Sequence, residues 1–469
     1  MIIEQIYTGC LAEAAYYIES EGEAAIIDPL RETEPYLQKA TKNGAKIKYI
    51  LETHFHADFV SGHIDLSAKT GGEIVYGPTA NPNFIAHIAK DGEILTLGKA
   101  KIKVLHTPGH TMESTTYLLI DENGQEKAIF TGDTLFIGDV GRPDLAVKTD
   151  LTREDLAGHL FDSLRNKIMT LPDEVIVYPG HGAGSACGKN MSAETSDTLG
   201  HQKKFNYALR EDMTKEEFIT EVTTGLVDPP QYFPKNAVMN KSGYDSFEEV
   251  MDRGLVPLST NDFKIIREEK EALVLDTRPK EEFVKGFIPG SIWIGIEDNF
   301  APWVGALITD LKQPILFIAE AGKEEEVVTR LSRVGYDNTL GYLKGGMTNW
   351  VNEGDKTDRL EVIDPANLAQ LYEKDKINII DVRKESEYNT QHIEGAENLP
   401  LDFIYKHLSK LDSDNTYYLH CQGGYRSVIA ASILKAKGYE NVINISGGFK
   451  ALLNTALKTT AYKEPVTML

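Results

Sequence analysis

The stretch that decides the fold is ETHFHADFVSGH, Glu52–His63, which follows an apolar run and places His54, His56 and Asp58 at alternate positions. Alternate residues of an extended chain point the same way, so these three side chains are expected to converge on one metal ion. Phe59 comes next, where many sites of this pattern carry a further ligand. Because an apolar ring has no lone pair to donate, the sequence predicts a metal site that has lost one donor.

The size and charge of the chain limit the kinds of protein to which it can belong. A length of 469 residues suggests roughly three domains, and 41% hydrophobic with 26% charged residues is typical of globular protein. We expect no membrane span and no secretory signal, because no apolar run reaches about 18 residues and the start lacks a basic segment before an apolar one. A net charge of −22 argues against nucleic acid and anionic membranes as partners, since both require clustered cations.

The three cysteines are Cys10, Cys187 and Cys421. An odd number in so long a chain cannot form a disulfide framework and favours a reducing compartment, so a cytoplasmic protein is expected. We expect Cys10 and Cys187 to be buried as small apolar side chains. A position near a substrate entrance stays open for Cys187, which comes six residues after His181.

The first predicted domain covers residues 1–245 and mixes strands with helices. Apolar strands are expected at AAIIDPL, IKYILETH and KVLHTPGH, and a helix at Thr198–Leu209. The Pro-containing segment Asp228–Gly243 is expected to be an ordered tail that closes this domain.

The remainder of the chain repeats itself with a period of about 100 residues, which indicates two copies of one small domain. The parallel segments are Leu273–Ile294 with Ile379–Leu399, and Gly335–Trp350 with Gly438–Leu453. The copies are predicted at 255–353 and 360–469, with 354–359 as the linker. Each alternates short apolar strands with helices, so each is expected to hold a parallel sheet covered on both faces.

Three further motifs of the first domain follow apolar strands: HTPGHT with His110, FTGDTLF with Asp133 and VYPGHG with His181. In this order after THFHAD, they resemble the metallo-β-lactamase fold over the whole first domain. The resemblance implies an α/β multidomain chain in which an αββα sandwich precedes the two smaller α/β domains. It also implies that the motif residues bind metal.

The replacement of a ligand by Phe59 favours one metal over two. In two-metal hydrolases of this fold the pattern is HxHxDH, and its last histidine belongs to the second ion. Here that ion would keep only Asp58, His181 and a share of Asp133, which is a poor tetrahedral zinc site.

The expected single site has His54, His110 and Asp133 as ligands. Two imidazoles and a carboxylate form the facial triad associated with Fe(II), so one Fe(II) per first domain is expected. His56 as a fourth ligand would favour zinc, and the sequence leaves this open. Asp58 would then lie behind the ligands and orient them or a bound water. His181 is expected either behind the ligands or as a further ligand.

The segment FIGDVGRPDLA, Phe136–Ala146, together with THFHADFVSG and PPQYFPKNA, is similar to the persulfide dioxygenase branch of this fold. That resemblance implies oxidation of a low-molecular-weight thiol persulfide by O2 to sulfite and thiol. Arg142 would then bind the carboxylate or phosphate of the substrate. An ion pair between Arg142 and Asp144 is the alternative.

The last domain carries YYLHCQGGYRSVIAASIL, Tyr417–Leu434, in which Cys421 follows an apolar strand and precedes a glycine loop and a helix. Backbone N–H groups and a helix N-terminus at that sulfur should stabilise a thiolate. With DVR (381–383) and SGGF (446–449), the segment resembles rhodanese domains. The resemblance implies catalytic roles for Cys421 and Arg426, and substrate binding by Gly423, Gly424 and Tyr425. A phosphatase loop is the weaker alternative, because Cys-x5-Arg is one residue longer than this Cys-x4-Arg.

The middle copy lacks the nucleophile. Counting back from Gly335 and Gly438 puts Ile318 at the place of Cys421, and no cysteine lies between 188 and 420. We therefore expect the middle domain to be a scaffold, with a degenerate substrate or partner site as the alternative.

Together these features predict a persulfide dioxygenase coupled to a rhodanese sulfurtransferase that interconverts sulfite and persulfide with thiosulfate and thiol, in sulfide detoxification. Two alternatives are a zinc-dependent, glyoxalase II-like thioester hydrolase with an accessory rhodanese, and a sulfur carrier or persulfide sensor. The sequence leaves open the thiol and the direction of sulfur transfer. It also leaves open the oligomeric state, for which a homodimer and a homotetramer are both allowed.

Overall fold

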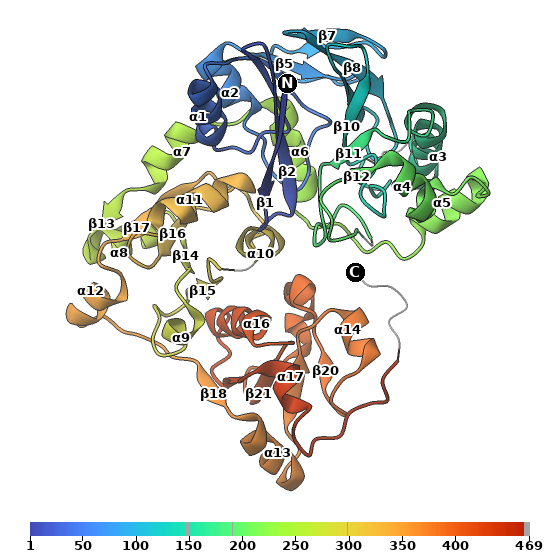
Figure 1. Cartoon of the computed structure of the whole chain (residues 1–469). Coiled ribbons are helices and arrows are strands. Elements are labelled where there is room, and N and C mark those ends of the chain that lie inside the picture. The colour runs from blue at the N-terminus through green and yellow to red at the C-terminus, as the bar shows by residue number, and fades with distance from the viewer. Residues whose placement is uncertain (147–149, 190, 298, 464–469) are drawn as a thin grey trace. The chain divides into compact units, whose positions relative to one another are not determined.

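A computed structural model describes residues 1–146, 150–189, 191–297 and 299–463 (Figure 1). Residues 464–469, the end of the third predicted domain, lie outside the described part. The chain forms two compact units, one of residues 1–249 with 331–335 and one of residues 250–330 with 336–469. Among the described residues, no helix is long and apolar enough to cross a bilayer.

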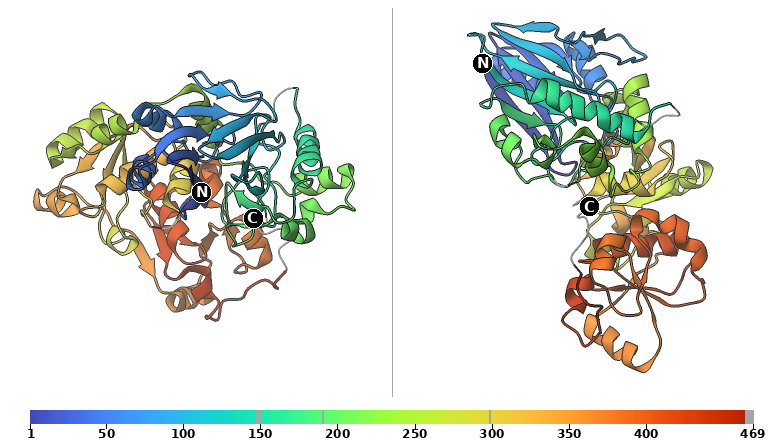
Figure 2. Two further views of the ribbon diagram at one scale, coloured as in Figure 1. Left: turned by 45° about the horizontal axis from the view of Figure 1, so that its top comes forward. Right: turned by 90° about the vertical axis from the view of Figure 1, so that its right-hand side faces the viewer.

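The first unit holds two six-stranded sheets whose strands lie in the blue to green part of the chain (Figure 2). The strands of the first sheet are, in spatial order, β1 (Ile2–Thr8), β2 (Glu13–Ser20), β3 (Glu23–Ile27), β4 (Lys46–Leu51), β5 (Glu73–Tyr76) and β6 (His87–Ile88). Those of the second are β12 (Asp197–Thr198), β11 (Ile176–Pro179), β10 (Glu126–Gly132), β9 (Thr115–Ile120), β8 (Ala100–His106) and β7 (Ile94–Leu97).

The two sheets pack face to face, and helices cover their outer faces. Apolar residues of both sheets, among them Ile27, Val104 and Phe130, form the core between them. Tyr36 and Leu66 pack helices α1 (Glu34–Asn43) and α2 (His63–Thr70) onto the first sheet. Helices α3 (Arg153–Ser163), α4 (Leu199–Phe205) and α5 (Lys215–Thr223) cover the second sheet, and the short helices η1 (Leu164–Ile168) and η2 (Tyr207–Leu209) follow α3 and α4. This is the expected αββα sandwich.

The segment expected to be an ordered tail, Asp228–Gly243, contains helix α6 (Phe233–Ser242). Pro234 lies in the first turn of this helix, where a missing backbone N–H costs nothing. Helix α7 (Phe247–Gly254) follows.

The second unit contains two five-stranded parallel sheets with the same strand order, as the internal repeat predicted. The middle sheet is β13 (Pro257–Leu258), β17 (Thr339–Leu343), β16 (Ile315–Ile318), β14 (Leu273–Asp276) and β15 (Ile292–Trp293). The last sheet is β18 (Glu361–Ile363), β22 (Val442–Ile445), β21 (Tyr417–His420), β19 (Asn378–Asp381) and β20 (Glu397–Asn398).

Helices connect the strands of each copy. In the middle copy they are α8 (Thr260–Glu269), α9 (Lys280–Phe283), α10 (Phe300–Leu307), α11 (Glu324–Arg333) and α12 (Gly346–Asn352). In the last copy they are α13 (Pro365–Lys374), α14 (Glu385–Thr390), η3 (Leu401–Phe403), α15 (Ile404–His407), η4 (Leu408–Lys410), α16 (Tyr425–Ala436) and α17 (Gly448–Leu452).

Strand register corrects one residue of the predicted repeat. Asp276 pairs with Ile318 between β14 and β16, as Asp381 pairs with His420 between β19 and β21. The counterpart of Cys421 is therefore Ala319, and the assignment to Ile318 was wrong by one position. The count failed because the middle copy has one residue fewer between this strand and the following glycine.

Candidate functional site

The predicted metal residues follow four strands of the first unit. His54 comes shortly after β4, His110 after β8, Asp133 directly after β10 and His181 after β11. The loops that hold them approach closely. A Cβ on Gly141 would lie 1.9 Å from the carbonyl oxygen of Asp133, so this loop fits only because residue 141 has no side chain.

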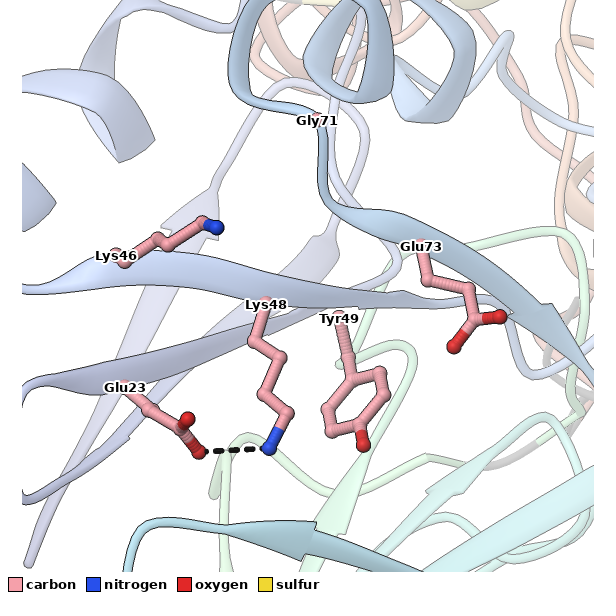
Figure 3. Close-up of a pocket in the computed structure, with 6 residues that line it drawn as sticks. All are labelled: Glu23, Lys46, Lys48, Tyr49, Gly71 and Glu73. Carbon is pink, nitrogen blue, oxygen red and sulfur yellow. Dashed lines mark hydrogen bonds and ion pairs between the residues drawn. The ribbon is translucent and has the colours of Figure 1, made fainter.

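One pocket lies at the opposite ends of the strands. It is lined by Glu23, Lys46, Lys48 and Glu73, from the amino ends of β3, β4 and β5, together with Tyr49 and Gly71 (Figure 3). Lys48 pairs there with Glu23 at 2.8 Å. It is a surface feature separate from the metal residues.

His54, His110 and Asp133 form a buried cluster whose donor atoms lie within 4.8 Å of one another. Asp133 Oδ2 is 3.3 Å from Nε2 of His110 and 4.0 Å from Nε2 of His54. Both carboxylate oxygens of Asp133 are buried without a hydrogen-bond partner. A buried carboxylate in this state is costly unless a cation compensates it, so the donor set fits a metal ion.

Hydrogen bonds fix the tautomers of the two histidines. Nδ1 of His110 donates to the carbonyl of Arg142 at 2.9 Å. Nδ1 of His54 lies 3.0 Å from Thr53 Oγ1, whose hydroxyl donates to Asp28 at 2.8 Å. Each ring therefore presents the lone pair of Nε2 to the cluster, which is the arrangement that metal-binding histidines require. Burial, with three neighbouring histidines, lowers the pKa of His54 well below its usual range and keeps it neutral.

His56 belongs to a second buried cluster, with Asp28 and Glu52. Its Nε2 lies 3.0 Å from Asp28 and 3.5 Å from Glu52. Burial opposes protonation, but these carboxylates raise the pKa of His56 to about 9. The expected convergence of His54 and His56 is wrong because β4 ends at Leu51, and the residues after it turn rather than alternate.

Phe59 packs its ring against His56, with the centroids 4.3 Å apart. It is fully buried. The residue that replaces a donor in the sequence therefore covers one face of the imidazole that turns toward Asp28.

A third cluster joins Asp58, His181 and Cys187. Nε2 of His181 lies 3.3 Å from Asp58 and 3.5 Å from Asp133 Oδ1, while its Nδ1 donates to the carbonyl of Ala12 at 3.2 Å. Asp133 thus faces the first cluster with one oxygen and the third with the other. Cys187 is buried, as expected, and it is also a possible metal donor that the sequence analysis missed. Burial, Asp58 and Asp133 raise its pKa well above its ordinary value. The expectation that Cys10 is buried was wrong: Cys10 is only partly buried, and its sulfur accepts from the guanidinium of Arg333 at 3.3 Å.

Asn240 is a second residue that the sequence analysis missed. From α6, its amide donates at 2.7 Å to the carbonyls of His56 and Phe59, and its side-chain oxygen accepts from the N–H of Ser61 at 2.9 Å. Asn240 thereby holds the histidine loop. No local pattern could have revealed it, because it lies about 180 residues along the chain from the loop.

Arg142 makes the ion pair that the sequence left as an alternative. Its guanidinium binds both oxygens of Asp144 at 2.7 Å, and it donates to the carbonyls of Ala186 and Val227. Substrate binding by Arg142 stays a prediction.

Known proteins match the chain in the same segments. Residues 8–181 match the metallo-beta-lactamase superfamily, and residues 259–353 and 364–455 match the rhodanese-like domain. A crystal structure of a metallo-beta-lactamase from Staphylococcus aureus is 33% identical, with a TM-score of 0.64, over 73% of this chain and 98% of that chain. The chain belongs to the metallo-beta-lactamase superfamily. Its first unit contains the superfamily domain, and two rhodanese-like domains follow.

Curated relatives align with the metallo-beta-lactamase domain. A probable hydroxyacylglutathione hydrolase of Schizosaccharomyces pombe is 28% identical over 51% of this chain and 96% of its own length. Hydroxyacylglutathione hydrolase GloC of Haemophilus influenzae is 32% identical over 36% of this chain and 85% of its own length. Both of these relatives are named as hydrolases.

In the last rhodanese-like domain, Cys421 directly follows β21 and its thiol is buried. The N–H of Gly424 donates to Sγ at 3.1 Å, and Gly424 has a φ of +102°, which favours glycine. Phe449 N donates to the carbonyl of Cys421 at 2.7 Å. Among the residues that the structure describes, a Cβ placed on Gly423 would meet nothing within 4 Å, so the loop is open at this residue.

Arg426 points its guanidinium at Glu387, with two hydrogen bonds of 2.6 and 2.9 Å. Burial would lower the pKa of Arg426, but the carboxylate of Glu387 raises it, so the pair is ionised. Tyr425 donates its hydroxyl to the carbonyl of Gly295 at 2.8 Å. Both residues lie at the start of α16, and their catalytic and substrate-binding roles stay predictions.

Proposed function

We propose that the first domain is an Fe(II) persulfide dioxygenase and that the last domain is a sulfurtransferase which uses Cys421. The overall oxidation is RSSH + O2 + H2O → RSH + sulfite + 2 H⁺. This proposal is more specific than the comparisons, which identify a metallo-beta-lactamase domain and two rhodanese-like domains.

The observation that carries the proposal is the direction of His56: its Nε2 faces Asp28 and not the first cluster, although its ring centroid lies 4.2 Å from that of His54. Two imidazoles and one carboxylate remain in the first cluster, because His56 faces Asp28 and Phe59 covers its ring. If it held a metal, that donor set would leave coordination positions open, and it is typical of Fe(II) oxygenases rather than of zinc hydrolases. Fe(II) held there would supply electrons and open positions for O2 and a soft sulfur.

The residues around the cluster prepare it for this chemistry. His110 and His54 are held as neutral rings by the carbonyl of Arg142 and by Thr53, so that neither can turn away from the ion. Burial of the cluster excludes bulk water, which protects a reactive sulfur species from side reactions.

The product of the first site is a substrate for the second. Cys421 would accept sulfane sulfur from a persulfide and pass it to sulfite as thiosulfate, or run the reverse reaction. The hydrogen bond from Gly424 to Sγ stabilises the anionic sulfur in both directions.

The second candidate is a zinc-dependent thioester hydrolase. It is favoured by the names of the curated relatives and by the cluster of Asp58, His181 and Cys187, which offers donors for a second ion. A two-zinc centre would use Asp133 as the bridge.

The deciding experiment measures metal content and O2 uptake on the same purified protein. With glutathione, coenzyme A and bacillithiol persulfides, we expect one iron per chain and O2 consumption with sulfite formation. Cys421→Ser should keep the O2 uptake and lose thiosulfate formation. Two zinc ions per chain, with thioester hydrolysis and no O2 uptake, would establish the hydrolase instead.

A further inference from the structure

The middle rhodanese-like domain contacts the sulfur-transfer loop of the last domain within the second unit. Tyr425 donates its hydroxyl to the carbonyl of Gly295 and packs its ring edge-on against Trp293, with centroids 5.1 Å apart. On the same helix, Ser432 Oγ accepts from the N–H of Trp293 at 3.0 Å. These contacts fix the start of α16, and therefore the loop, against the middle domain.

Lys280 brings a positive charge to this loop from the middle domain. Its Nζ lies 3.7 Å from the point where a Cβ on Gly424 would stand, and Gly424 is the residue whose N–H binds the sulfur of Cys421. The side chain is about one-third exposed. Its ion pair with Glu281 spans 3.5 Å, and Glu281 is 72% exposed, so solvent weakens that pair.

Three cations of the last domain near the loop, Arg426, Arg383 and Lys384, face acids, while Lys450, whose N–H donates to the carbonyl of Gln422, has an exposed side chain. Arg426 binds Glu387 through both guanidinium nitrogens, so little of its charge is left for an incoming anion. The other pairs are Arg383 with Asp381, and Lys384 beside Asp402. An anionic substrate at Cys421 should therefore be bound most strongly by a cation that has no buried acid partner.

We propose that Lys280 binds the oxygens of the anionic sulfur substrate of Cys421, a sulfite or thiosulfate group, and that the middle domain thereby completes the sulfur-transfer site. The proposal rests on the sulfurtransferase part of the proposed function. In the transfer, the Cys421 thiolate forms a bond to the outer sulfur of thiosulfate while the S–S bond of thiosulfate breaks, and the electron pair leaves with sulfite. The reverse step forms thiosulfate, and Lys280 holds the sulfite oxygens in both directions.

The first test does not depend on the enzyme reaction. Alkylation of Cys421 by anionic iodoacetate and neutral iodoacetamide is followed by mass spectrometry of the Cys421 peptide. Lys280→Ala should lower the iodoacetate to iodoacetamide rate ratio about tenfold, as expected for loss of one charge-assisted contact. Lys280→Arg should keep most of the ratio. Lys285→Ala, which removes an exposed charge just beyond the same helix, is the matched control and should leave it unchanged.

The second test measures sulfur transfer from thiosulfate to cyanide by the full chain. Lys280→Ala should raise the KM for thiosulfate about tenfold and change kcat by less than twofold, because Lys280 binds oxygens and does not touch the transferred sulfur. An active wild-type protein with an unchanged KM and an unchanged alkylation ratio in Lys280→Ala would overturn the inference. A wild-type protein without sulfurtransferase activity would overturn the proposed function, while a lowered alkylation ratio would still support anion binding by Lys280.

Discussion

Removal of the metal should destabilise the first unit alone. Asp133 is buried with both oxygens lacking hydrogen-bond partners, so a chelated protein keeps a buried carboxylate without compensation. Each unsatisfied buried oxygen costs about 1–3 kcal/mol, which gives roughly 2–6 kcal/mol for the two. For a domain of about 150–250 residues, 1 kcal/mol shifts Tm by about 2–4 °C, so chelation should lower Tm by roughly 5–20 °C.

The positions of the tryptophans provide the assay. All three, Trp293, Trp303 and Trp350, lie in the middle domain, so tryptophan fluorescence follows the second unit while far-UV circular dichroism follows both units. We expect chelation to lower the temperature of the first transition in circular dichroism and to leave the temperature of the fluorescence transition unchanged. His110→Ala should melt at the same temperature with and without chelator. An equal downward shift of both signals, or no shift in either, would refute a buried ion held by the first cluster.

Three further predictions follow from single contacts. Asp28→Asn removes the charged acceptor of Thr53 and so loosens His54; we expect metal affinity, measured by competition with a chelator, to fall about 10–100-fold. Glu21→Gln, which changes an exposed acid in the turn before β3, should leave it unchanged. Gly141→Ala places a methyl group 1.9 Å from the carbonyl of Asp133 and should lower both metal content and Tm; a wild-type metal content would contradict the loop packing. Burial raises the pKa of Glu387, but the ion pair with Arg426 outweighs it and lowers the pKa below the ordinary 4.5. The ion pair therefore stabilises the fold above pH 4.5, and this stabilisation is lost as the pH falls through the lowered pKa. In an acid titration, Glu387→Gln should not show this loss of stability.

The sequence predicted the fold class and the members of the first metal cluster because both depend on local patterns. Apolar runs that end in His, Asp or Gly mark the ends of β4, β8, β10 and β11, and the topology brings those ends together. The duplicated domains were visible for the same reason.

Residues that act across large sequence separations could not be predicted. Asn240 reaches the histidine loop only through the packing of α6. Cys187, although only six residues after His181, approaches the distant Asp58 only through the fold. His56 was misplaced because alternation describes a strand, whereas the chain bends immediately after Leu51 and redirects this ring to Asp28. The counterpart of Cys421 was missed by one residue because only strand pairing, not a count between glycines, fixes register.

The contact of Tyr425 with Gly295 and Trp293 has a consequence for the history of the duplicated domain. The middle copy has no cysteine at the place of Cys421, so catalysis does not constrain its sequence. Its contacts with Tyr425 of the last copy do constrain it. Without the last domain, the middle domain would expose Trp293, and without the middle domain, α16 would lose the contacts at Tyr425, so we expect the two copies to be stable only together.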